Sequence, residues 1–237
     1  MLNLDINYKY YFSSDDKDTI LMLHGWGCKG DIFKQHVDNL QDKYNILVVD
    51  LYGFGQSIDP KPFFDTYEYA VQIYLLLYRL GLGKVHILAH SFGGRLALIL
   101  SSLFDIEITK MVLTGCAGLK VKHSLGYYIR VGLYKLCKRL GLYLDSGSRD
   151  YNSANSIMRK VLTRVVNQNL DYLLYRIKST TMLVWGKMDK ETPMYMCSKL
   201  HKNITDSSVM LINSGAHFCI FTHTYLCNNK IKEFLEL

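Results

Sequence analysis

The sequence contains no long apolar run. Its longest apolar stretches are broken by Lys, Arg or Gly within one or two helical turns, short of the roughly 18 apolar residues that a membrane-spanning helix needs. The first twelve residues, MLNLDINYKYYF, also lack the uninterrupted apolar segment of a secretory signal peptide, because Asn3, Asp5 and Lys9 interrupt it. We therefore expect a cytoplasmic protein without a membrane span.

Paired cysteines are absent as well. The six cysteines include no CxxC pair, and only Cys219 and Cys227 lie within ten residues of each other. Disulfide frames and zinc sites need regular cysteine spacing, so the sequence predicts neither, and we expect no metal and no cofactor. We interpret the thiols as reduced and mostly buried. With only three prolines, the chain also has no Pro-rich linker that would separate two domains.

Charge is unevenly distributed along the 237 residues. The net charge is +7, and residues 119–178 hold twelve Lys or Arg against three acids, a net of +9 that leaves −2 for the remainder. Three interpretations stay open for this basic segment: a solvated face, which we favour, a face that attracts anionic substrates, or a helix that docks on anionic lipid. Nucleic-acid binding is disfavoured, because the aromatic residues of the segment recur at helical spacing, as core residues do.

Short apolar runs alternate with longer amphipathic stretches such as 67–82 and 93–103. Six runs end as buried parallel strands do, namely TILMLHG from Thr19, NILVVD from Asn45, KVHILAHS from Lys84, ITKMVLTG from Ile108, TMLVWG from Thr181 and SVMLIN from Ser208. This alternation predicts a doubly wound, mostly parallel α/β sheet.

The alternation stops between residues 119 and 178. There a stripe of apolar residues at helical spacing predicts a helical insertion, or cap, with the members Leu125, Ile129, Leu133, Leu136 and Leu140. We expect an α/β core of residues 1–118 and 179–237, and a basic cap of residues 119–178.

A candidate nucleophile lies in AHSFGG, where an apolar run meets an amphipathic one. A small-x-Ser-x-Gly pattern between a strand and a helix holds the serine on a strained turn, and its neighbours must be small because strand and helix nearly collide. Ala89 replaces the commoner first glycine, whereas Gly93 keeps the second. By itself the pattern does not distinguish a nucleophilic Ser91 from a strand-to-helix turn that carries Ser and Gly only because its backbone requires them.

A serine hydroxyl needs a base, and the base needs an orienting group. His217, in NSGAHF after the last apolar run, is the favoured base, and Asp189, in WGKMD after the preceding run, is the favoured acid. Residues that follow successive parallel strands meet at one sheet edge, where such sheets bind ligands. The alternative is that Asp189 and Glu191 are solvated loop acids. Asp50 precedes the serine in a turn-rich loop and looks structural.

Backbone amides are the expected donors to an oxyanion, because groups fixed before the reaction stabilise the developing charge without reorganisation. Phe92 follows the candidate nucleophile and supplies the first donor. Trp26, in the HGWG turn, is the expected second donor, and its indole would border an acyl pocket. We interpret His24 in the same turn as structural.

The segments HGWG, DLYGFGQS, AHSFGG, WGKMD and GAHF resemble, in this order, the α/β-hydrolase superfamily over nearly the whole chain. The resemblance implies an eight-stranded sheet with a cap after the sixth strand, and here there is room for one strand before Thr19. The HGWG and HSFGG forms look most like small bacterial carboxylesterases and related menaquinone-pathway and biotin-pathway enzymes.

A serine in the elbow disfavours the dehalogenases and epoxide hydrolases of this superfamily, which use aspartate as the nucleophile. The resemblance implies that Ser91, His217 and Asp189 hydrolyse a carboxylic ester, thioester or amide of a small-molecule acyl substrate through an acyl-enzyme. Two rivals stay open, a triad-bearing lyase or synthase similar to the menaquinone-pathway enzyme, and a non-catalytic member that binds a ligand.

Overall fold

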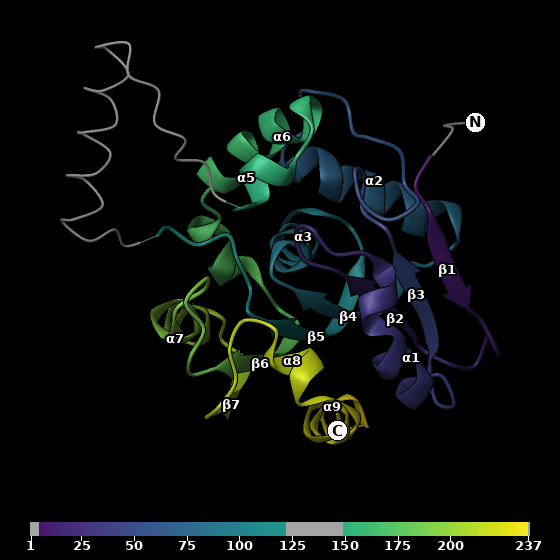
Figure 1. The fold of residues 1–237 in the computed structure, drawn as a ribbon. Helices are drawn as coiled ribbons and strands as arrows, with labels where there is room; N and C mark the ends of the chain where they lie inside the picture. Colours follow the sequence, from purple (N-terminus) through teal and green to yellow (C-terminus); the bar gives the residue numbers. More distant parts are fainter. Residues whose placement is uncertain (1–4, 122–148, 237) are drawn as a thin grey trace, which may run out of the picture.

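The computed structural model describes residues 5–121 and 149–236. In this part of the chain seven strands form one sheet in the order β1-β3-β2-β4-β5-β6-β7 (Figure 1). β1 pairs antiparallel with β3, and the other neighbours are parallel. The strands are β1 (Tyr8–Tyr11), β2 (Thr19–Leu23), β3 (Asn45–Val49), β4 (Lys84–His90), β5 (Glu107–Thr114), β6 (Thr180–Gly186) and β7 (Ser207–Ile212).

This sheet confirms the doubly wound, mostly parallel architecture. Six strands coincide with the six apolar runs, and β1 is the strand before Thr19. The described residues form seven strands, and the insertion follows β5, the fifth of them in chain order. Both β2 and β3 are buried at every position, because helices cover both faces of the sheet.

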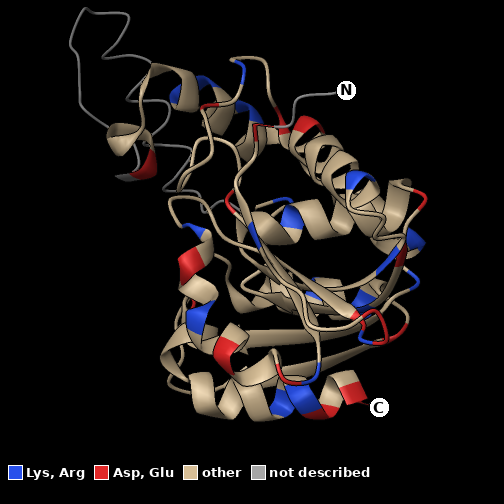
Figure 2. Ribbon diagram, turned by 90° about the vertical axis from the view of Figure 1, so that its right-hand side faces the viewer, with Lys and Arg blue, Asp and Glu red and all other residues tan. Residues whose placement is uncertain are grey.

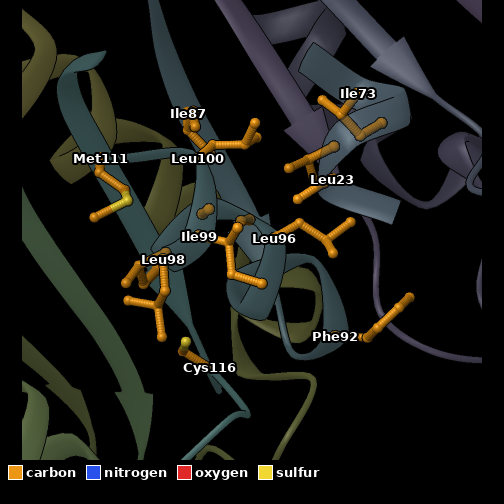
Figure 3. Close-up of a cluster of buried hydrophobic side chains, with 14 of the residues drawn as sticks. Leu23, Ile73, Ile87, Phe92, Leu96, Leu98, Ile99, Leu100, Met111 and Cys116 are labelled. Carbon is orange, nitrogen blue, oxygen red and sulfur yellow. The ribbon is translucent and has the colours of Figure 1, made fainter. Parts of the chain in front are cut away.

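Helices pack on the two faces of the sheet as two layers. One core cluster joins alternate strand residues such as Ile20 and Met22 to η1, α1, α8 and α9, and the other joins Leu21 and Leu23 to α2, α3, α6, η2 and α7. Figure 3 shows part of the second cluster around α3. The bounds are η1 (Gly30–Phe33), α1 (Lys34–Leu40), α2 (Thr66–Arg79), α3 (Phe92–Leu103), α5 (Arg149–Ser153), α6 (Ser156–Asn167), η2 (Asp171–Arg176), α7 (Met194–Asn203), α8 (Cys219–Thr222) and α9 (Thr224–Glu236).

The described part of the insertion is α5, α6 and η2, of which α6 and η2 contribute to the core beside α3. The buried Arg95 of α3 donates from Nη1 to the carbonyl oxygens of Val165 and Gln168, both at 2.8 Å, where α6 ends. Burial lowers the pKa of this guanidinium to about 10, so it stays charged at neutral pH and complements the negative end of the helix. The predicted leucine stripe of residues 125–140 lies outside the described residues.

Charged residues are spread around the described ribbon, and both signs occur on several sides of it (Figure 2). None of the helices within the described ranges combines the length and the hydropathy that crossing a bilayer requires.

Candidate active site

Ser91 lies on the turn between β4 and α3 in a strained conformation. Its φ of 51° and ψ of −108° make it the only non-glycine residue with positive φ among those that the structure describes. The turn is tight, because a Cβ added to Gly93 would lie 2.2 Å from the carbonyl oxygen of Leu23. The Gly93 N–H donates to the His24 carbonyl oxygen at 3.0 Å, which fastens the turn to the loop after β2.

Three side chains form a continuous hydrogen-bonded chain at the carboxyl edge of the sheet. The Ser91 hydroxyl lies 3.0 Å from Nε2 of His217, and Nδ1 of His217 lies 2.9 Å from Oδ2 of Asp189. Both His217 and Asp189 are buried, while Ser91 is partly exposed. The structure thus brings together the three residues that the sequence singled out, and their role in catalysis is proposed below.

Besides the imidazole of His217, three other hydrogen-bond donors hold the carboxylate of Asp189. Its Oδ1 accepts from the backbone N–H of Glu191 at 2.9 Å and of Thr192 at 2.8 Å, and its Oδ2 accepts from the Thr192 hydroxyl at 2.7 Å. Burial alone would raise the pKa of this carboxyl, but the hydrogen bonds from His217 and Thr192 outweigh burial and hold the pKa below its ordinary value. Asp189 is therefore ionised and fixed in position at neutral pH.

Two glycines make room where the loops of Asp189 and His217 approach each other. A Cβ on Gly186 would lie 2.3 Å from the carbonyl oxygen of Gly215, so the loop after β7 comes this close to the end of β6 only because Gly186 carries no side chain. After β5, Gly115 has a φ of 51°, and a Cβ there would lie 3.0 Å from two ring atoms of His217. Gly115 therefore leaves the space in which the imidazole lies.

The two expected oxyanion donors border the nucleophile. Neither the Trp26 nor the Phe92 backbone N–H donates a hydrogen bond to any residue in the described ranges. A Cβ on Gly25 would lie 3.2 Å from Cβ of Ser91, which shows how closely the HGWG turn approaches the serine. The Trp26 ring packs against the rings of Phe54 and Phe92, with centroids 5.0 and 5.5 Å away. This arrangement suits the predicted roles of both amides, which stay predictions.

Two further histidines near the site are buried and neutral. His24 donates from Nδ1 to the Gly25 carbonyl oxygen and accepts at Nε2 from the Leu51 N–H, and burial lowers its pKa to about 4. His90 donates from Nδ1 to the Thr114 carbonyl oxygen, and burial together with the neighbouring His217 lowers its pKa to about 3. We assign both rings to the packing of the site.

Ser91 and His217 open into a cavity of about 700 Å³. Its other lining residues are Gly25, Trp26, Gly27, Cys28, His90, Asp150, Ser153, Glu191 and Phe218. An adjoining cavity of about 320 Å³ shares Trp26, Gly27, Asp150 and Ser153 and adds apolar groups of Phe54 and Met158. Among the described residues no Lys or Arg lines either space, and no three His, Cys, Asp or Glu residues are grouped as metal ligands.

The basic cap residues therefore contribute no described side chain to the cavity lining. Of the twelve basic residues in segment 119–178, Lys122, Arg130, Lys135, Lys138 and Arg139 lie outside the described residues. Arg159 and Arg164 instead bond to backbone carbonyl oxygens at the surface. The surface positions of Arg159 and Arg164 agree with the interpretation of the basic segment as a solvated face.

Comparison with known proteins identifies the family. A model described as the alpha/beta hydrolase fold matches residues 18–135. The chain belongs to the alpha/beta hydrolase fold family.

Relatives of this alpha/beta hydrolase span almost its whole length. It is 23% identical to the uncharacterized hydrolase YugF of Bacillus subtilis, over 98% of this chain and 95% of that protein. It is 24% identical to a 2-hydroxy-6-oxononadienedioate/2-hydroxy-6-oxononatrienedioate hydrolase of Pseudomonas putida, over 98% and 93%. Among solved structures, an esterase from Exiguobacterium antarcticum has a TM-score of 0.78 at 20% identity, covering 98% of this chain and 96% of the esterase.

Sequence reasoning missed several residues of this alpha/beta hydrolase site. Thr192 stands three residues after Asp189, and an Asp followed at that distance by Thr is a pattern that signals a local side-chain-to-backbone turn. Gly115 and Asp150 carried no such signal, because each reaches the site only through the fold. Glu191 was named only in the alternative that both loop acids are solvated, and although its side chain is 67% exposed it also contacts His217.

Proposed function

We propose that this alpha/beta hydrolase is a serine hydrolase that cleaves a carboxylic ester, thioester or amide through an acyl-enzyme on Ser91. The observation that carries the proposal is the unbroken chain from Ser91 Oγ through His217 to Asp189, at the wall of a cavity. The strained backbone of Ser91 supports the same assignment, since strain concentrates where a side chain must be presented to a ligand.

In the first half-reaction, Nε2 of His217 accepts the Ser91 proton as Oγ forms a bond to the acyl carbon. The backbone N–H groups of Trp26 and Phe92 stabilise the negative charge that develops on the acyl oxygen. Collapse of this intermediate breaks the bond to the leaving group, which takes the proton from His217, and leaves the acyl group on Ser91.

In the second half-reaction, His217 accepts a proton from water as the water oxygen attacks the acyl carbon. Breakdown of the second intermediate returns that proton to Ser91 and releases the carboxylic acid. Asp189 accepts the Nδ1–H bond throughout, which selects the tautomer whose Nε2 is free to accept a proton and stabilises the imidazolium.

Labelling with a fluorophosphonate probe tests the proposal, because such probes react with activated serines. We expect the wild-type protein to be labelled and Ser91→Ala to be unlabelled. Ser153→Ala is the matched control, since Ser153 also lines the cavity but has no imidazole partner among the described residues. Labelling of Ser91→Ala at the wild-type level would contradict the assignment, as would an unlabelled wild-type protein.

A second candidate is hydrolysis of a carbon–carbon bond. It is favoured by the relatives named for 2-hydroxy-6-oxo-dienedioate hydrolysis and by a Pseudomonas fluorescens meta-cleavage product hydrolase with a TM-score of 0.76 at 18% identity, covering 98% of this chain and 94% of that one. Turnover of a 2-hydroxy-6-oxononadienedioate far faster than of simple esters would select this candidate. Binding without turnover of either class would favour a ligand receptor, as a Petunia hybrida relative at 22% identity is named.

A further inference from the structure

Glu191 contacts the same imidazole nitrogen as the nucleophile does. Its Oε2 lies 3.3 Å from Nε2 of His217, and the Ser91 hydroxyl lies 3.0 Å from that nitrogen. The backbone of Glu191 is held in place, because its N–H donates to Oδ1 of Asp189 at 2.9 Å. Its side chain lines the cavity together with Ser91 and His217. A carboxylate therefore lies beside the atom through which the proposed reaction moves its protons.

The effect of this contact depends on whether His217 is protonated. In the resting site the ionised Asp189 accepts the Nδ1–H bond, so Nε2 carries a lone pair and gains nothing from a neighbouring carboxylate. Once Nε2 has taken the Ser91 proton, the ring is a cation, and a carboxylate oxygen at 3.3 Å attracts it. Glu191 thus favours the imidazolium over the neutral ring, and the proposed reaction forms the imidazolium only as it proceeds.

The other titratable groups around the His217 ring leave this difference to Glu191. Among the described residues they are Asp189 on the loop after β6, His90 at the end of β4, Cys28 on the loop after β2, Asp150 on α5 and Cys219 on α8. Burial and the neighbouring His217 lower the pKa of His90 to about 3, and burial raises the pKa of both thiols, so these three groups are uncharged at neutral pH. Within the described ranges, the acids with an oxygen within 4 Å of a His217 ring nitrogen are Asp189 and Glu191.

We propose that Glu191 stabilises the protonated form of His217 in both half-reactions, and thereby sets the pH below which the site loses its base. This inference rests on the proposed function, because it assigns a further catalytic residue to the same reaction. The proton stays on Nε2 until the leaving group or Ser91 takes it, and the carboxylate acts only through its charge. Since the Glu191 side chain is 67% exposed, water weakens the attraction to that of a surface ion pair.

The pH dependence of ester hydrolysis tests this inference. The measured quantity is kcat/KM for an uncharged p-nitrophenyl ester across the pH range in which histidine titrates, in wild type, Glu191→Gln and Glu191→Lys. Glutamine keeps the size of the side chain and removes its charge, and lysine reverses the charge. Glu233→Gln and Glu233→Lys make the same changes at an exposed glutamate of α9 that does not line the cavity. Charges elsewhere in the chain act on all five proteins alike, so the differences isolate position 191.

We expect the acid limb of the profile to move toward lower pH by about 0.5 pH unit in Glu191→Gln and about twice as far in Glu191→Lys. The plateau above the limb should fall about two- to threefold in Glu191→Gln, because the imidazolium is then harder to form. Added salt should move the wild-type limb toward that of Glu191→Gln, because salt screens exposed charges. Both Glu233 variants should keep the wild-type profile. A Glu191→Gln limb that stays in place, or an equal displacement in Glu233→Gln, would overturn the inference.

Nuclear magnetic resonance separates failure of the inference from failure of the proposed function. The pH titration of the His217 ring signals in Ser91→Ala does not depend on turnover, and a His217→Gln variant identifies these signals among those of the eight histidines. We expect the midpoint of this titration to lie about 0.5 pH unit lower when Glu191→Gln is added to Ser91→Ala. If the wild type hydrolyses no ester, the proposed function fails, and the two midpoints still decide the effect of Glu191. Equal midpoints refute it.

Discussion

The hydroxyl of Thr192 is the most specific test of how the site holds its acid. Thr192→Val keeps the shape of the side chain and removes the 2.7 Å hydrogen bond to Oδ2 of Asp189. A hydrogen bond to a charged group contributes about 1.5 to 3 kcal/mol. Because Asp189 keeps its bonds from His217 and from two backbone N–H groups, we expect the lower end of that range.

A loss of about 1.5 kcal/mol from the stabilised transition state corresponds to roughly a tenfold fall in kcat/KM. Steady-state hydrolysis of an uncharged p-nitrophenyl ester measures it. Thr192→Ser restores the hydroxyl and should recover most of the activity. Thr181→Val, which removes a buried hydroxyl bonded to the Ser179 carbonyl oxygen, is the control for loss of a threonine hydroxyl away from the site. A folded Thr192→Val protein with at least half the wild-type kcat/KM would show that this hydrogen bond does not position Asp189 for catalysis.

Three further predictions follow from single contacts. Gly115→Ala should lower kcat/KM, measured in ester hydrolysis assays, about tenfold or more, because the new Cβ would lie 3.0 Å from two ring atoms of His217. Arg95→Met should lower the free energy of unfolding by about 2 to 4 kcal/mol in urea titrations, because two carbonyl oxygens lose their donor. Asp189→Asn should be less stable than wild type at pH 7, and the difference should shrink below pH 4.

The pH dependence follows from the depressed pKa of Asp189. A carboxyl whose pKa is lower in the folded state stabilises the fold above its unfolded value, near 3.8, and this contribution disappears as the pH falls through the folded-state pKa. Urea titrations of wild type and variant at pH 7 and pH 3 measure it. A difference that grows at acid pH would contradict the assigned direction of the shift.

Controls separate local from general effects for the other two variants. Gly83→Ala places a Cβ in open space and should leave kcat/KM unchanged, whereas equal losses at Gly83 and Gly115 would contradict the contact with His217. Arg79→Met removes an exposed arginine and should change the free energy of unfolding by less than about 0.5 kcal/mol. Equal stability of Arg95→Met and wild type would show that α6 does not depend on the buried guanidinium.

The sheet was predictable because its signal is local. A buried parallel strand is a short apolar run, and the runs from Asn45, Lys84 and Thr181 begin at the first residue of a strand or one residue inside it. The bounds of the first strand were not predictable, although the sequence left room for one strand before Thr19. β1 is a mostly exposed edge strand of four residues, YKYY, whose apolar pattern is weak.

The meeting of Ser91, Asp189 and His217 was predictable because successive parallel strands end at one edge of the sheet. The contacts of Gly115 and Asp150 were not, since each depends on which loops the fold brings to the cavity. The role of Arg95 was hidden for a related reason: an arginine on a helix next to the elbow gives no sign that the end of another helix, 70 residues later, lies against it.

Trapping the acyl-enzyme tests directly whether Ser91 is the nucleophile. Wild-type protein is mixed with a p-nitrophenyl ester, quenched in acid within the first turnover and digested, and the modified peptide is located by tandem mass spectrometry. We expect an adduct with the mass of the acyl group on Ser91, absent from Ser91→Ala and retained in Ser153→Ala. An adduct on Cys28 or elsewhere, or ester hydrolysis that persists in Ser91→Ala, would contradict it.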